Sequence, residues 1–209
     1  MYRDDEVLTA IRQKDVGTIV TAFFSRDLSL IMPNYRTETE LWDYKLICPP
    51  ISGAAIEWGE ISKDVLAFHN TGKGGLLIFG VSDKDYEVHG ISNAQQIDSK
   101  IFNDKIRKYV GDKLWVEYYT QCNKDKTIII GIAIIPPLQE QKAIKRFQTN
   151  GPEKKGRRIF DQNGAAIRNN DSSIILSPVD ANGFELSRPS VLYREFEIDE
   201  PQFRLLSAD

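Results

Sequence analysis

The chain has 209 residues, of which 41% are hydrophobic and 27% charged, a composition typical of a globular protein with a substantial core. Its formal net charge of -3 excludes a strong overall basic field, although a local basic patch stays open because net charge averages over all faces. Two cysteines without a CxxC pair exclude a disulfide framework and a cysteine-built zinc site, and two histidines exclude a histidine-rich metal site.

The charged N-terminus and the short apolar runs predict a cytoplasmic protein without a membrane partner. The N-terminal "MYRDDEV" is charged from its third residue, unlike a signal peptide. The longest apolar run, "TIIIGIAIIPP", is far shorter than the roughly 20 residues that a membrane helix needs. Cys48 and Cys122 are then expected to be buried thiols in a reducing compartment.

In chain order, apolar residues at helical spacing predict a helical segment over residues 4–30, with a break at Gly17. The aromatic and branched run "ELWDYKLI" predicts a strand that ends at two prolines. A helix is expected over 57–69, with one apolar face made by Trp58, Ile61, Val65 and Phe68. Glu60, Lys63 and Asp64 are expected on its other faces.

The second half of the chain is predicted to be richer in strands. "GGLLIFGVSD" is nearly continuously apolar, which indicates a strand buried on both faces, and "KDYEVHGI" a short returning strand. A helix over 94–110 precedes a hairpin made of "LWVEYYTQ" and "TIIIGIAII". "AIKRFQT", "RRIFD" and "AAIRNN" are predicted short strands. This order predicts an α+β fold, in which helices flank a mixed β-sheet.

Three parts follow from these patterns. Residues 1–35 form an N-terminal helical segment, and residues 36–178 form the main domain. Residues 179–209 are acidic and aromatic without a clear period, which suggests a tail or a linker to a missing module.

Acidic side chains interrupt the apolar strand around position 43. Asp43 and Lys45 are two apart, so in a strand they share a face, where a carboxylate can hold a divalent metal and a lysine can stabilise a phosphate. Glu38 lies five residues before Asp43 and needs a bend to reach that face. Asp83 ends the long apolar strand, where polar site residues often project. The alternatives are a solvated edge strand and, for Asp83, a turn.

Residues 142–168 form a basic segment, which is a candidate for a second kind of site. Only Glu153 and Asp161 are acidic in it, and Phe147 and Phe160 lie between the basic residues, a pattern that suits a nucleic-acid backbone. A solvated hairpin is the alternative reading. The basic residues are Lys142, Lys145, Arg146, Lys154, Lys155, Arg157, Arg158 and Arg168.

Three phrases resemble those of Schlafen-type AlbA-like domains. "EISKDVLAFHNTGKGGLLIFGVSDKDYEVHGI" is similar to the family's central signature, and "AAIRNNDSS" is similar to its closing "YxRxGSS" strand. "ETELWDYK" stands where the family reads like "ESxxVEFK". The resemblance covers about residues 36–178. The chain departs from it at Asp43, which replaces a glutamate, at Ser82, which replaces an acid, and at the inserted Lys73.

The resemblance implies an endoribonuclease that depends on Mg²⁺ or Mn²⁺ and cuts structured RNA, tRNA first. Glu38, Asp43 and Asp83 would be the metal ligands, and Lys45 would support the phosphate or the attacking water. By analogy the domain is expected to self-associate or to be joined to a sensor or ATPase module, as in phage-defence proteins. The alternatives are a regulatory module that binds DNA or RNA without cutting it, and a structural domain.

Overall fold

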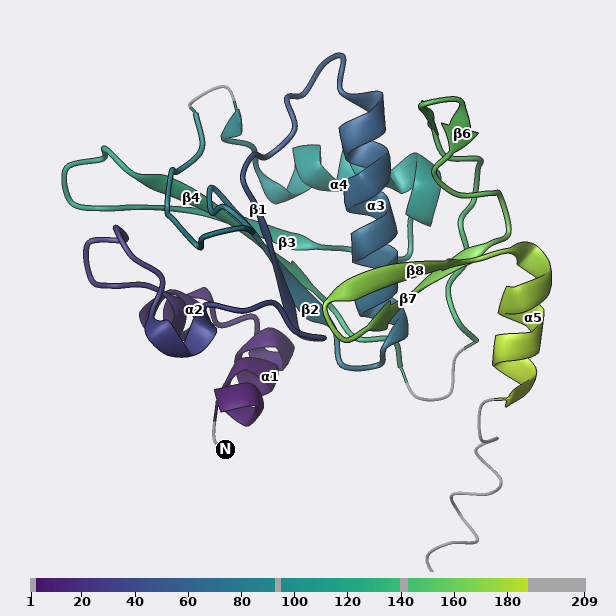
Figure 1. The fold of residues 1–209 in the computed structure, drawn as a ribbon, viewed down its shortest axis with the longest axis horizontal. Coiled ribbons are helices and arrows are strands. Elements are labelled where there is room, and N and C mark those ends of the chain that lie inside the picture. Colours follow the sequence, from purple (N-terminus) through teal and green to yellow (C-terminus); the bar gives the residue numbers. More distant parts are fainter. Residues whose placement is uncertain (1–2, 93–94, 140–142, 188–209) are drawn as a thin grey trace, which may run out of the picture.

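A four-stranded mixed β-sheet forms the centre of the fold (Figure 1). The computed structural model describes residues 3–92, 95–139 and 143–187. The strands are β1 (Trp42–Lys45), β2 (Gly75–Phe79), β3 (Glu117–Cys122) and β4 (Ile129–Ile135), in the order β1-β2-β4-β3. β1 pairs with β2 in parallel, and the other two pairs are antiparallel. The predicted α+β fold with a mixed sheet is confirmed.

Alternating residues of the sheet pack into two separate hydrophobic cores, one on each face. Leu76 and Ile78 of β2 face a cluster that includes α1 (Arg3–Gln13) and α2 (Val16–Phe23). Leu77 and Phe79 face the opposite cluster, which includes α3 (Ala55–Asn70) and α4 (Ser99–Val110). Because both faces are covered, all five β2 residues are buried, as the apolar run predicted.

The N-terminal segment is helical over a shorter range than predicted. After α2 the chain forms a tight turn, closed by a bridge between Phe24 and Ile31. The Asp27 carboxylate accepts hydrogen bonds from Ser25 and Ser29, and such local bonds compete with the helix. A 3₁₀ helix, Pro33–Tyr35, then leads to β1.

Helices α3 and α4 lie close to their predicted positions. Trp58, Ile61, Val65 and Phe68 are all buried, which confirms the predicted apolar face of α3. α4 begins at residue 99 instead of 94, because Asp98 caps it by accepting a hydrogen bond from the main-chain N–H of Ile101. Within the described residues, no helix is long and apolar enough to cross a membrane.

Two small hairpins follow the sheet. β5 (Glu153–Lys154) pairs with β6 (Arg157–Arg158), and β7 (Ala165–Asn169) pairs with β8 (Ser172–Leu176) beside α3 (Figure 1). The predicted tail starts with α5 (Pro178–Ser187), and residues 188–209 lie outside the described residues.

The prediction of a strand over "AIKRFQT" is wrong. The main chain of Lys145 bonds to the side-chain amide of Asn70, donating at 2.8 Å and accepting at 2.9 Å. The N–H groups of Phe147 and Gln148 donate to carbonyls of Gly164 and Tyr109. This segment is therefore held by hydrogen bonds to the Asn70 side chain and to the main chain of Tyr109 and Gly164, and it is not assigned as a strand.

Candidate functional site

Asp43 lies in the middle of β1 and is 4% exposed. Its neighbours Trp42 and Tyr44 belong to the core under α1 and α2, so strand alternation turns Asp43 and Lys45 toward the other face. Lys45 Nζ lies 2.9 Å from Asp43 Oδ2. The structure thus brings together the acid and the lysine that the sequence placed on one face.

Arg168 reaches the same carboxylate from β7. Its Nη1 lies 3.4 Å from Asp43 Oδ2, its Nη2 donates to the carbonyl of Thr39, and its guanidinium lies 4.5 Å from the ring centre of Phe68. The Arg168 side chain is only 1% exposed. It was predicted to contact nucleic acid, and this burial corrects that prediction, because a group enclosed by the fold cannot reach a phosphate backbone.

Asp64, on α3, completes the set of buried charges. Lys45 Nζ lies 3.0 Å from Asp64 Oδ2, and Lys63 Nζ lies 3.6 Å from Asp64 Oδ1. Burial opposes ionisation of Asp64, but the two ammonium groups outweigh it and lower the pKa of this carboxyl. The sequence analysis placed Asp64 on an outer face of the helix. Its spacing from Ile61 and Phe68, three and four residues away, was the signal for burial.

We call Asp43, Lys45, Asp64 and Arg168 the Asp43 cluster. It is continued along α3 by ion pairs of alternating sign. Lys63 Nζ lies 2.7 Å from Glu60 Oε2, and Lys154 Nζ of β5 lies 2.9 Å from Glu60 Oε1. An unbroken row of charges therefore joins the buried carboxylate of Asp43 to the β5–β6 hairpin.

Glu38 joins this site by a bend in the chain before β1. Because β1 is an edge strand, the N–H of Tyr44 is free to bond outside the sheet, and Glu38 Oε1 accepts from it at 2.9 Å. Burial, a hydrogen bond with Asp43 and the charge of Asp43 together raise the pKa of Glu38 to about 8. The Glu38 and Asp43 carboxyl groups therefore meet despite their five-residue spacing, and Glu38 holds its proton to a higher pH than a free glutamate does.

Asp83 does not meet these two carboxylates as a third ligand. Only one group of three ligand-type side chains, Asp85, Glu87 and His89, has its ligand atoms within 4.8 Å of one another in the described part of the chain. Asp83 is exposed after β2. Burial first, and then the charges of Glu38, Asp83 and Asp171, raise the pKa of Tyr86, so Asp83 and Glu38 act on one phenol.

A comparison with family models identifies the domain. The family model described as "Schlafen, AlbA_2" matches residues 38–177, more than half of the chain. The chain belongs to this Schlafen family. The comparison with curated proteins finds no match.

One solved structure has a similar fold over most of the chain. The DIP2311 protein from Corynebacterium diphtheriae has a similar fold, with a TM-score of 0.51 and 12% sequence identity. The match covers 88% of the present chain and 33% of that protein, so the chain spans about one third of the length of this relative. At this identity the likeness concerns the fold alone.

The basic segment of the Schlafen domain is mostly paired. Lys154 contacts Glu60, Arg158 contacts Asp161 at 2.8 Å, and Arg146 contacts Glu185. Lys155 and Arg157, at the turn of the β5–β6 hairpin, are exposed and have no ion-pair partner among the described residues. Lys145 is partly exposed, and Lys142 lies outside the described residues.

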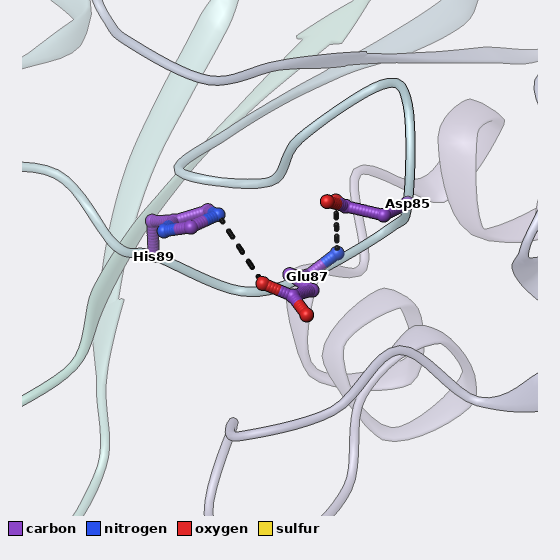
Figure 2. Close-up of side chains that lie close together, drawn as sticks. All are labelled: Asp85, Glu87 and His89. Carbon is purple, nitrogen blue, oxygen red and sulfur yellow. Dashed lines mark hydrogen bonds and ion pairs between the residues drawn. The ribbon is translucent and has the colours of Figure 1, made fainter.

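The group of Asp85, Glu87 and His89, which we call the 85–89 cluster, lies on the loop after β2 (Figure 2). All three residues are exposed, and Glu87 Oε2 lies 3.9 Å from His89 Nε2. Carboxylate and imidazole groups at this spacing are compatible with a divalent cation. The sequence analysis missed the cluster, because Asp85 lies in a turn and Tyr86 has a φ of 61°, so no regular strand alternation brings the three side chains together.

Proposed function

We propose that this chain is a metal-dependent endoribonuclease domain that acts on structured RNA, with tRNA as the first candidate. The observation that carries the proposal is the meeting of Glu38, Asp43 and Lys45 at the edge of the sheet, within a domain of the Schlafen family. Two carboxyl groups and an ammonium group at one place supply the charges that phosphodiester cleavage uses.

The donor set fits a hard divalent cation such as Mg²⁺ or Mn²⁺. Glu38 and Asp43 offer carboxylate oxygens, and the charge of Asp43 helps to raise the pKa of Glu38, so a bound cation would relieve the repulsion between the two groups. These two residues would hold the ion, whereas Asp83, the predicted third ligand, does not lie together with them among the described residues. A bound cation supplies Lewis-acid activation of a water molecule and of the phosphate.

Lys45 has the position for phosphate stabilisation. Its side chain is 29% exposed while its ammonium group contacts Asp43, so it can reach a bound phosphate without leaving the cluster. A preorganised cation at this place stabilises negative charge as it develops on the phosphate oxygens. The exposed Lys155 and Arg157 supply further cations for the RNA backbone.

A second function, nucleic-acid binding without cleavage, is favoured by the charge balance at Asp43. Its Oδ2 is already paired with Lys45 and with Arg168. A carboxylate neutralised by two protein cations has less need of a metal ion. In this reading the acids stabilise the fold, and the exposed basic residues bind DNA or RNA in a regulatory role.

Incubation with total tRNA separates the two functions. The wild-type chain is mixed with tRNA in Mg²⁺, in Mn²⁺ or in EDTA, and the fragments are separated on a denaturing gel. We expect discrete fragments with metal and none with EDTA. The Asp43→Asn variant keeps the shape of the side chain but should not cleave, while its tRNA affinity stays equal or rises. Binding without fragments under every metal condition would reject the nuclease and leave the binding module.

A further inference from the structure

Lys45 is held by two carboxylates that come from different elements. Its ammonium nitrogen lies 2.9 Å from Asp43 Oδ2 on its own strand and 3.0 Å from Asp64 Oδ2 on α3. A lysine side chain has four flexible bonds and makes no fixed fork, so one partner two residues away does little to orient it. Two carboxylates on separate elements fix the ammonium group between them.

Stability alone does not explain why a charged residue, Asp64, occupies a buried position. The residue is 3% exposed in the middle of α3, next to core residues Ile61, Val65 and Phe68. A buried ion pair is generally no more stabilising than apolar residues of similar size, because desolvation offsets the attraction between the charges. An apolar residue at position 64 would pack in this core, so the charge is better explained by what it does to Lys45.

The two oxygens of Asp64 have separate partners. Oδ1 lies 3.6 Å from Lys63 and Oδ2 lies 3.0 Å from Lys45. Lys45 therefore keeps a carboxylate partner when Asp43 turns an oxygen toward another cation. Without Asp64, Asp43 would be the one remaining ion-pair partner of Lys45 among the described residues, and the ammonium group would either close on Asp43 or move away into solvent.

We propose that Asp64 is a positioning residue that holds the ammonium group of Lys45 beside Asp43 in the orientation used on the RNA phosphate. This inference rests on the proposed nuclease function, and it gives Asp64 no contact with RNA or metal. Asp64 acts through Lys45 alone, so its effect should vanish when Lys45 is removed.

A double-mutant cycle tests that dependence. Asp64→Asn is compared with the wild type, and Asp64→Asn/Lys45→Met with Lys45→Met, in metal-dependent tRNA cleavage. In the wild-type background, we expect kcat to fall about 10- to 100-fold with KM nearly unchanged, the size typical of groups that orient a catalytic residue. In the Lys45→Met background, we expect Asp64→Asn to change kcat less than about twofold.

Ser62→Ala is the matched control. Ser62 is buried on the same helix, its hydroxyl donates to the carbonyl of Trp58, and among the described residues it has no hydrogen bond to the Asp43 cluster. This variant should keep the wild-type kcat. If Asp64→Asn lowers the melting temperature, the double variant, which removes both charges, should recover part of it, and the cycle is then read at a temperature where all four proteins are folded.

The outcomes separate this inference from the function on which it rests. A wild-type chain that never cleaves RNA removes both. An active wild type in which Asp64→Asn has the full kcat of the wild type overturns the positioning role alone. Equal losses of kcat in the two backgrounds overturn it as well, because Asp64 would then act on cleavage by a route other than Lys45.

Discussion

The Asp43 cluster and the 85–89 cluster both collect carboxylates, but their surroundings differ. Asp43 is buried and paired with two cations, and its neighbour Glu38 has a pKa raised to about 8. Asp85 is exposed, and hydrogen bonds from Ser82 and from the main chain of Glu87 lower its pKa.

This difference shows that the proximity of ligand-type groups does not by itself mark a site. The 85–89 cluster has the tighter spacing of ligand atoms, yet water screens its charges. The Asp43 cluster is the stronger candidate because burial makes its charges depend on particular partners, which raise the pKa of Lys45 and lower the pKa of Asp64.

The largest expected difference between the clusters is in RNA cleavage. Asp43→Asn should lower metal-dependent cleavage of tRNA by at least about 100-fold, because it removes a charge at the reacting centre. Asp85→Asn should change it less than about twofold. Initial rates at saturating Mn²⁺ measure both. A large loss in Asp85→Asn with normal cleavage by Asp43→Asn would reverse the assignment of the site.

Stability should follow burial in the same way. Arg168→Met leaves Asp43 short of a partner in the interior, and breaking a buried ion pair costs about 3–5 kcal/mol. His89→Ala removes a side chain that is 51% exposed and should change the free energy of unfolding by less than about 0.5 kcal/mol. Denaturant unfolding measures both variants. Equal small effects would show that Arg168 is not needed to balance Asp43.

The pH dependence of stability should come from Glu38 and not from Asp85. The pKa of Glu38 is raised from 4.5 to about 8, so the folded chain binds a proton that the unfolded chain has lost. Stability is therefore highest below about pH 4.5 for this group and falls as pH rises toward 8. Glu38→Gln cannot titrate and should lose this decline, whereas Asp85→Asn should keep it. Melting temperatures from pH 5 to 9 in EDTA check this.

The smallest expected effect concerns the exposed cations. Lys155→Gln and Arg157→Gln should each weaken tRNA binding modestly and reduce the slope of log K against log salt by up to about 1, as loss of one phosphate contact does. Binding isotherms at several salt concentrations measure this slope. Lys124→Gln, on the turn between β3 and β4, is the control, and an equal change there would mean that the hairpin is no preferred contact.

The sequence by itself determined the elements and the pairing of nearby residues. A nearly continuous apolar run predicted the buried strand β2, two apolar runs around a polar loop predicted the β3–β4 hairpin, and helical spacing predicted the inner face of α3. It also placed Asp43 and Lys45 on one face, because two residues of one strand need no other element to define their relation. These features are local, and local periodicity encodes them.

The tertiary structure decided which charges are buried and which acids meet. Arg168 looked like one cation among eight, and only the packing of β7 on α3 encloses it. Glu38 reaches Asp43 because the Tyr44 N–H, on the outer side of an edge strand, donates to its carboxylate, whereas Asp83 stays in an exposed loop. The sequence shows which side chains are charged, but the partner of a buried charge lies on another element of the fold. The energy of a buried charge depends on that partner, so only the tertiary structure decides it.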